Sequence, residues 1–307
     1  MEAAFARTVW QVLEPLHAVT YFAPESREAN GAVGLRGFWM GYFAARAAPL
    51  GAVPAGVVEA VFFNFHPAMV RRAIPDAWGF ATPGTVLRAR TEAAAGALRR
   101  TTTALSAADE VDAADEVDAA DVMDAADAAA EIVPLLERVV ADADGAGRPL
   151  FAANRGLPTP EDRVGALWQA ATTLREHRGD GHVAVLTAEG LNGCEAHVLF
   201  AACADVPAGI LRDNRGWSAQ DWQAAADRLT VRGLLDSGGR PTDRGRALRS
   251  HIEARTDALA VQPYRTLTPT EAAQLLGLLG LLADRVLTSG TIPFPNPMGL
   301  PPRHARA

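Results

Sequence analysis

The stretch Gly233-Leu234-Leu235-Asp236-Ser237-Gly238-Gly239-Arg240-Pro241-Thr242-Asp243-Arg244-Gly245-Arg246 decides the fold of the C-terminal part of the chain. Two short extended pieces flank its Gly-Gly pair, which is typical of a tight turn between paired strands. A helix is predicted before it over residues 218–232, with Ser218 as N-cap and Asp221 three residues on. A long helix follows to about Ala260, capped by the Thr-Asp pair. The order is helix, β-wing, helix.

The rest of the chain is predicted to be helical nearly throughout. Apolar positions recur at helical spacing, with Pro and Gly between the runs, and these runs cover residues 3–19, 37–46, 54–65, 67–72, 85–105, 132–143, 160–177 and 193–204. We therefore expect a mainly α protein with a helical N-terminal domain, residues 1–150, and a winged helix-turn-helix C-terminal domain, residues 151–307, that carries the wing and ends in helices.

Several short motifs in the C-terminal half occur in a recognisable order: Trp217-Ser218, Asp227-Arg228-Leu229, Arg232-Gly233-Leu234-Leu235, Thr242-Asp243-Arg244-Gly245, Ile252-Glu253 and Thr256-Asp257. In this order residues 185–262 resemble MarR-type winged helix-turn-helix proteins. The complete chain, with His17-Ala18-Val19-Thr20-Tyr21-Phe22 and Arg46-Ala47-Ala48-Pro49-Leu50-Gly51, resembles an actinobacterial set of proteins labelled winged-helix, and that likeness implies no particular activity.

The MarR resemblance implies binding of duplex DNA through the helix that begins after Ser218. The residues of this helix argue against it, because Asp221 and Asp227 occupy the turns that should meet bases and phosphates, and no arginine accompanies them there. Phosphate contacts dominate affinity for DNA. Arg240, Arg244 and Arg246 of the wing remain available as a phosphate clamp, but we expect DNA binding to be weak.

Composition excludes some classes of protein. All 29 basic residues are arginine, so a Schiff base, and with it an imine of pyridoxal phosphate, is excluded. The longest apolar run that could suggest a membrane helix, residues 275–283, is too short to span a bilayer, and we expect no signal peptide at the start of the chain. Cys194 and Cys203 have neither zinc nor disulfide spacing. We expect a cytoplasmic protein without a membrane segment.

Residues 107–131 form a conspicuous acidic segment. They hold ten carboxylates and no arginine, and without those ten charges the formal net charge would be about +3 instead of -7. The aspartates recur at every third position and so drift around a helix instead of lining one face. We expect a solvated helix or loop whose removal leaves the fold intact, with a partner-binding tail as the alternative.

The stretch Leu174-Arg175-Glu176-His177-Arg178-Gly179-Asp180-Gly181-His182 is the strongest indication of chemistry. We expect its two glycines to interrupt the helix and to aim side chains into a pocket. In this hypothesis His177 or His182 is a general base, Asp180 orients a histidine, and Arg178 or Arg175 holds an anion. The alternatives are a surface ion pair, a helix C-cap, a turn and a buried histidine.

A second group of candidate residues lies among the N-terminal aromatics. Polar side chains are interleaved with rings there, as in many small-molecule sites, and the predicted ligand-binding residues are His17, Tyr21, Trp39, Arg46, Asn64 and His66, together with Arg175 of the central stretch. We expect the central stretch to face these aromatics across one cavity. His17 or His66 would then lie opposite His177 or His182.

Spacing also allows a metal site to be considered, from His177, His182, Glu195 and His197. Glu195 and His197 are two apart on a helix and point to different sides, so no metal or other cofactor is predicted. The favoured function is binding of a small aromatic or amphipathic metabolite with cofactor-independent acid-base conversion, of the lyase, isomerase or hydrolase type. The alternatives are a MarR-like ligand-responsive regulator and a metabolite-sequestering protein, and a homodimer is compatible with each.

Overall fold

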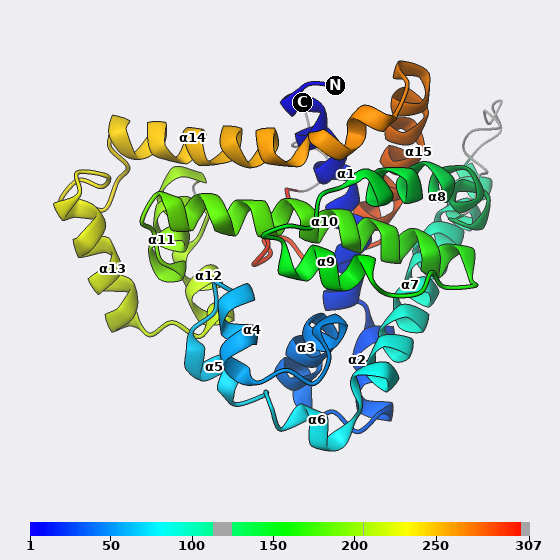
Figure 1. Cartoon of the computed structure of the whole chain (residues 1–307), viewed down its shortest axis with the longest axis horizontal. Helices are drawn as coiled ribbons and strands as arrows, with labels where there is room; N and C mark the ends of the chain where they lie inside the picture. The colour runs from blue at the N-terminus through cyan, green and yellow to red at the C-terminus, as the bar shows by residue number, and fades with distance from the viewer. Residues whose placement is uncertain (113–124, 205, 302–307) are drawn as a thin grey trace.

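The computed structural model describes residues 1–112, 125–204 and 206–301, and this part of the chain is almost entirely helical (Figure 1). Within these ranges no strand is formed, and a single antiparallel bridge joins Leu235 to Pro241. The prediction of a mainly α protein is confirmed. None of the helices in the described ranges combines the length and the apolarity that are needed to span a bilayer.

Fifteen α-helices follow one another in these ranges, with short 3-10 turns at Ala48–Leu50 and Gln262–Thr266. Their bounds are α1 Ala3–Phe22, α2 Pro24–Ala32, α3 Gly37–Ala47, α4 Ala55–Val61, α5 Pro67–Arg71, α6 Ala77–Phe80, α7 Pro83–Asp112, α8 Ala125–Asp142, α9 Pro149–Arg155, α10 Arg163–Ala188, α11 Gly193–Ala204, α12 Ala208–Arg215, α13 Ala219–Val231, α14 Asp243–Ala260 and α15 Pro269–Thr288.

Helix α10 is the centre of the molecule. It crosses the middle of Figure 1 beneath α14 and packs against α1, α7, α8 and α9 as well. Asp162 caps its start, because the carboxylate accepts a hydrogen bond from the backbone N–H of Gly165 at 3.0 Å. Nearly every residue from Val164 to Leu174 is buried, as expected of a helix that is covered on all sides.

The expected break at Gly179-Asp180-Gly181 is wrong: α10 continues through it to Ala188. Packing outweighs the low helix propensity of glycine at this point. Arg148 lies against Gly181, where a Cβ atom would come within 2.7 Å of its Nη1. The same guanidinium donates to the carbonyl oxygens of His177 and, at 2.7 Å, of Leu259. Gly181 therefore lets one arginine join α10 to α14.

Three clusters of buried apolar side chains form the core. The first joins α1, α7, α8, α10 and α15, the second surrounds α3 to α5, and the third lies between α11, α13 and α14. The predicted domain boundary after residue 150 falls within α9, and the division into two domains stays a prediction.

The helix starts in the C-terminal part are confirmed. Ser218 and Asp221 form a reciprocal capping box at the start of α13, and Thr242 caps α14. The expected strands of the wing are absent from the described residues, where a tight turn stands instead, closed by a hydrogen bond of 2.9 Å from the Asp236 N–H to the Arg240 carbonyl. Pro241 has no N–H to extend a ladder.

The acidic segment is described only in part, because residues 113–124 lie outside the described ranges. From Ala125 onward the segment belongs to α8, and Ala125, Ala128 and Ala129 are buried in the first core cluster. The expectation that residues 107–131 present no packed face is therefore wrong for its last seven residues. The small alanine side chains allow close helix packing there.

Two glycines of α10 give a matched test of this packing. A Cβ atom at position 179 would meet nothing closer than 3.5 Å, so Gly179→Ala should raise the free energy of unfolding by about 0.5–1 kcal/mol. Gly181→Ala should lower it by about 1 kcal/mol, because Arg148 loses a hydrogen bond. Urea unfolding measures both changes, and a stabilising Gly181→Ala would contradict the role given to Arg148.

Candidate functional site

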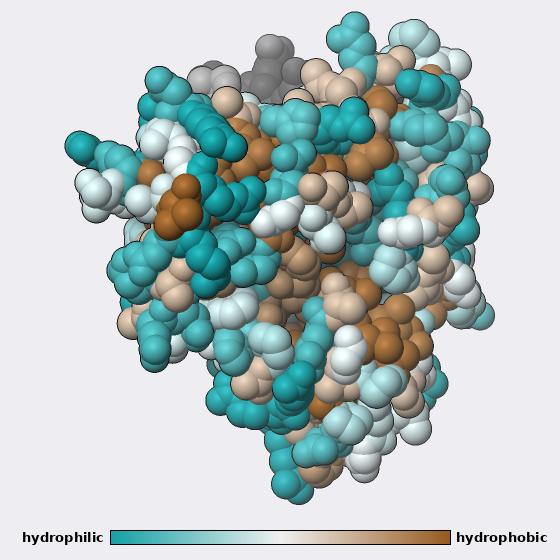
Figure 2. Space-filling model, turned by 60° about the vertical axis from the view of Figure 1, so that its left-hand side comes forward, coloured by the Kyte–Doolittle hydropathy of each residue, from teal (hydrophilic) through white to brown (hydrophobic). Residues whose placement is uncertain are grey.

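A cavity of about 460 Å³ lies between α1, α3, α10 and α12, and we call it the aromatic chamber. Eight aromatic rings line it, those of Tyr21, Phe22, Phe38, Trp39, Tyr42, Phe62, Phe63 and Phe65. On the face shown in Figure 2, hydrophobic residues gather in a hollow that polar residues border. The structure brings seven predicted site residues to this one chamber: Tyr21, Trp39, Arg46, Asn64, Arg175, Asp180 and His182.

A buried ion network forms the polar side of the aromatic chamber. Glu176 of α10 accepts hydrogen bonds of 2.9 Å from Arg46 of α3 and from its neighbour Arg175. Arg175 also donates to Glu14 of α1 at 3.2 Å. Burial alone would raise the pKa of Glu176, but the two guanidinium groups outweigh it and hold that pKa at about 2. The carboxylate is therefore charged at neutral pH. It links α10 to α3 directly and, through Arg175, to α1.

Arg215, at the end of α12, also reaches the aromatic chamber, and sequence reasoning missed it. Its guanidinium lies over the Phe65 ring, 4.7 Å from the centroid, and donates to the Pro297 carbonyl at 2.9 Å. No carboxylate of the described residues lies within ion-pair distance of it. Burial and the nearby Arg46 lower the pKa of Arg215. An anion beside this side chain would therefore be stabilised.

His17 is buried behind the chamber wall and reaches the chamber only through Tyr21. Its Nε2 lies 2.7 Å from the Tyr21 hydroxyl, and its Nδ1 lies 2.9 Å from the hydroxyl of Thr172. Burial lowers the pKa of His17 and raises that of Tyr21, so both groups are neutral. The pair fixes the orientation of the phenol that faces the cavity.

The proposed role of Asp180 in orienting a histidine is not what the structure shows. Its carboxylate accepts a hydrogen bond of 2.9 Å from the Phe151 N–H, at the first turn of α9. Burial, with Glu176 adding to it, raises the pKa of Asp180 to about 6. Asp180 thus lines the aromatic chamber and holds the start of α9.

Two further predicted residues, His177 and His66, also do not line the aromatic chamber. The His177 ring packs edge-on against Phe151, with 4.9 Å between ring centroids, and burial lowers its pKa to about 3. His66 is the N-cap of α5 and packs edge-on against Trp217. Neither side chain lines the aromatic chamber, because α10 continues as a helix and turns His177 towards α9.

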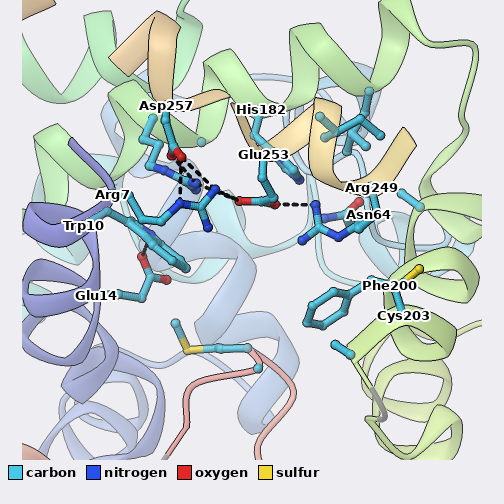
Figure 3. A pocket seen from close by; sticks show the side chains of 18 of the residues that line it. Arg7, Trp10, Glu14, Asn64, His182, Phe200, Cys203, Arg249, Glu253 and Asp257 are labelled. Atoms are coloured by element: carbon cyan, nitrogen blue, oxygen red, sulfur yellow. Dashed lines mark hydrogen bonds and ion pairs between the residues drawn. The ribbon is translucent and has the colours of Figure 1, made fainter. Parts of the chain in front are cut away.

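A larger cavity of about 1000 Å³ adjoins the aromatic chamber along α10, and we call it the polar chamber (Figure 3). The predicted site residue Arg178 lines this cavity and does not line the aromatic chamber. It donates to Glu253 and to Asp257, each at 2.9 Å, and lies over the Trp10 ring. Arg7 joins the same two carboxylates. The arginines Arg7 and Arg249 face each other across Glu253 in Figure 3.

His182 lines both chambers, and its hydrogen bonds define its tautomer. The Thr256 hydroxyl donates to the Ile252 carbonyl at 2.8 Å, so it can only accept from the Nδ1–H of His182, 3.0 Å away. Nε2 of His182 is then an unprotonated acceptor. Burial lowers the pKa of His182 to about 4, which keeps the ring neutral at physiological pH.

Within the described ranges no group of three or more His, Cys, Asp or Glu side chains is placed to hold a metal ion. His182 and His197 both line the polar chamber. Glu195 instead pairs with Arg228 at 2.5 Å and caps the start of α11 through the backbone N–H of Asn192. The metal-ligand set considered from spacing is therefore not assembled.

Helices α12 and α13, which are joined by a short turn, are held against the wall of the aromatic chamber. Gly216 between them has a φ of 74°, in the left-handed region that favours glycine. The Trp217 indole N–H donates to the Asn64 carbonyl at 3.0 Å, and the His66 N–H donates to the Arg215 carbonyl at 2.8 Å. Residues 63–66, which we call the 63–66 loop, thus contact both the chamber and the turn.

Buried neutral histidines predict a marked acid sensitivity. Burial lowers the pKa of His17, His177, His182 and His197. The unfolded chain therefore binds more protons than the folded one between pH values of about 6.5 and 4, and stability is lost as the pH falls through this window. The raised pKa of Asp180 acts in the opposite direction below about pH 6.

The free energy of unfolding should therefore fall by about 3 kcal/mol for each pH unit between about pH 6 and pH 5, which is the linkage slope for two to three protons. Urea unfolding at a series of pH values measures it. His182→Gln should reduce the slope by about one proton. A flat profile in the native protein would show that these rings are protonated in the folded state.

Comparison with known proteins gives one match. A model of a helix-turn-helix family matches residues 6–293, which is nearly the whole chain. No curated protein and no solved structure matches it. The finer likeness to MarR-type proteins and the actinobacterial origin stay predictions. The helical architecture, the docked α12–α13 pair and this match lead to one conclusion: the chain belongs to a helix-turn-helix family.

Proposed function

We propose that this helix-turn-helix protein binds a small amphipathic anion in the aromatic chamber. The observation that carries the proposal is the combination of an aromatic wall with an arginine, Arg215, that lacks a carboxylate partner among the described residues. Small-molecule sites are typically apolar cavities with a few convergent polar groups. The volume of about 460 Å³ lies within the range for such sites.

The charges around the aromatic chamber support an anionic ligand. Glu176 is shared by Arg46 and Arg175, and Glu14 balances the second of these arginines. This leaves the positive charge of Arg215 uncompensated. A carboxylate or sulfonate beside Arg215 would form a charge-assisted hydrogen bond, and the aromatic rings would cover the apolar body of the ligand.

Binding is favoured over acid-base conversion of the ligand. The most efficient general base has a pKa near the working pH. The pKa of His182 is lowered to about 4 by burial, so its Nε2 is a weak base, and Asp180 is engaged with the start of α9. These groups are better suited to orient a ligand than to move a proton of low acidity.

A fluorescent aromatic anion tests this function directly. The probe 8-anilinonaphthalene-1-sulfonate should bind the native protein with one site per chain. Arg215→Met should weaken it about 10- to 100-fold, since a hydrogen bond to a charged group contributes about 1.5–3 kcal/mol. Fluorescence titration and calorimetry measure this affinity.

The matched control is Arg212→Met, because Arg212 belongs to the same helix but pairs with Asp213 at the surface. Its affinity for the probe should equal that of the native protein. Circular dichroism of both variants checks that the fold is retained. Absence of saturable binding by the native protein, or equal affinities of the Arg215 and Arg212 variants, would refute the proposed site.

A second candidate function is a ligand-responsive DNA-binding regulator, with the MarR-type likeness as its finer form. The family match and the contact of the 63–66 loop with both chamber and turn favour it. The surface of the reading helix does not, because Asp227 is exposed on α13. The wing arginines Arg240 and Arg246 already pair with Asp236 and Asp243.

Purified protein should therefore bind random duplex DNA only weakly at about 0.15 M salt. A gel shift and fluorescence anisotropy at several salt concentrations measure this. Asp227→Arg should strengthen the binding, since it replaces a carboxylate with a phosphate-binding group. Tight, sequence-specific and salt-dependent binding of the native protein would make the regulator the leading function.

A further inference from the structure

We infer that the aromatic and polar chambers form one bipartite site for an elongated aromatic anion that bears N–H or O–H groups near its middle and a second anionic group at its polar end. This inference rests on the proposed function, because it extends the ligand beyond the aromatic chamber. Seven residues line both chambers, and we call them the seam: Asn64, Arg175, Gly179, His182, Arg215, Pro297 and Met298. The two cavities are thus separated by a single layer of residues.

Unpaired polar atoms lie at the seam. Oδ1 of Asn64 is buried and has no hydrogen-bond partner within the described residues. Nε2 of His182 is an unprotonated acceptor because Thr256 fixes the tautomer. A buried acceptor without a partner is unfavourable. Both atoms can accept a hydrogen bond from a ligand. The inferred ligand therefore carries N–H or O–H groups near its middle, where it would pass the seam.

Gly179 supports a passage between the chambers. Glycine in the middle of a helix is less favourable than alanine. Gly181 is explained by the close approach of Arg148, but nothing lies within 3.5 Å of the position that a Cβ atom would take at Gly179. Packing therefore does not require glycine at position 179. A missing side chain there leaves room at the seam, on the helix that lines both chambers.

The two chambers differ in chemistry, and this difference defines the two ends of the ligand. Eight aromatic side chains line the aromatic chamber, whereas a cluster of arginines and carboxylates lies in the wall of the polar chamber (Figure 3). There Arg7, Arg178 and Arg249 share the two carboxylates of Glu253 and Asp257. More guanidinium than carboxylate groups face this cavity, so its end of the ligand is polar and anionic.

Two related dyes test the inference. The dimeric dye 4,4′-dianilino-1,1′-binaphthyl-5,5′-disulfonate has two aromatic units, two N–H groups and two anionic groups, and 8-anilinonaphthalene-1-sulfonate corresponds to one half of it. The dimeric dye should bind with one molecule per chain and at least tenfold more tightly than the single dye. The ratio of the two dissociation constants is the measured quantity.

Gly179→Leu should reduce this ratio to below about threefold, because the leucine side chain fills the seam. The matched control is Gly277→Leu on α15, where the glycine is exposed and no atom lies near its Cβ position. The control should keep the ratio of the native protein. In a second variant, Phe200→Ala removes a ring that lines only the polar chamber, and it should weaken the dimeric dye at least fivefold.

The outcomes separate the two proposals. If the single dye does not bind, the proposed function fails. If the single dye binds but the ratio is unchanged in both Gly179→Leu and Phe200→Ala, the aromatic chamber stands and the bipartite site is overturned. If Gly179→Leu does not fold, Phe200→Ala decides alone: a ratio lowered at least fivefold supports the inference, and an unchanged ratio overturns it.

Discussion

The shared carboxylate of Glu176 is the interaction on which the arrangement of this protein depends. It binds Arg46 from α3 and Arg175 from α10, and through Arg175 it is linked to Glu14 of α1. Breaking a buried pair by removing one partner is costly, because the other charge stays in a medium of low polarity. Three of the helices around the aromatic chamber, α1, α3 and α10, are therefore held in one relative position by ion pairs in addition to apolar packing. This explains why a chamber wall made of rings can remain open instead of collapsing.

The permanent charge of arginine determines the electrostatic character of the two cavities. Arginine is the only basic side chain in the protein besides histidine, and it cannot lose its charge under ordinary conditions. Every arginine that enters the interior must therefore find a carboxylate, a carbonyl or a ring. Arg178 finds two carboxylates and the Trp10 ring, whereas Arg215 finds a carbonyl and the Phe65 ring. Arg178 therefore has a structural role, whereas Arg215 is a candidate for contacting a ligand.

Local signals in the sequence predicted local structure well. Ser218 with Asp221 and Thr242 marked helix starts, because capping depends on residues three positions apart. The break at Gly179-Asp180-Gly181 was wrong because Arg148, which explains Gly181, lies far away in sequence. Arg215 and Asp257 were missed as site residues for the same reason, because their partners come from distant parts of the sequence. His177 was predicted to be in the site from the cluster of polar residues around it and His66 from its position among aromatics, but helix rotation and a capping role turn them away from the cavities.

The 63–66 loop is hydrogen-bonded through its backbone to the turn between α12 and α13, and its side chains reach the aromatic chamber. The Asn64 carbonyl and the His66 N–H hold the turn, and the rings of Phe63 and Phe65 line the cavity. Backbone groups are the same for every residue except proline. Substitutions at positions 63 and 65 can therefore change the shape of the cavity while the two backbone hydrogen bonds to the turn are kept. Sequence change during evolution can thus alter the cavity without breaking the hydrogen bonds that connect the loop to α12 and α13.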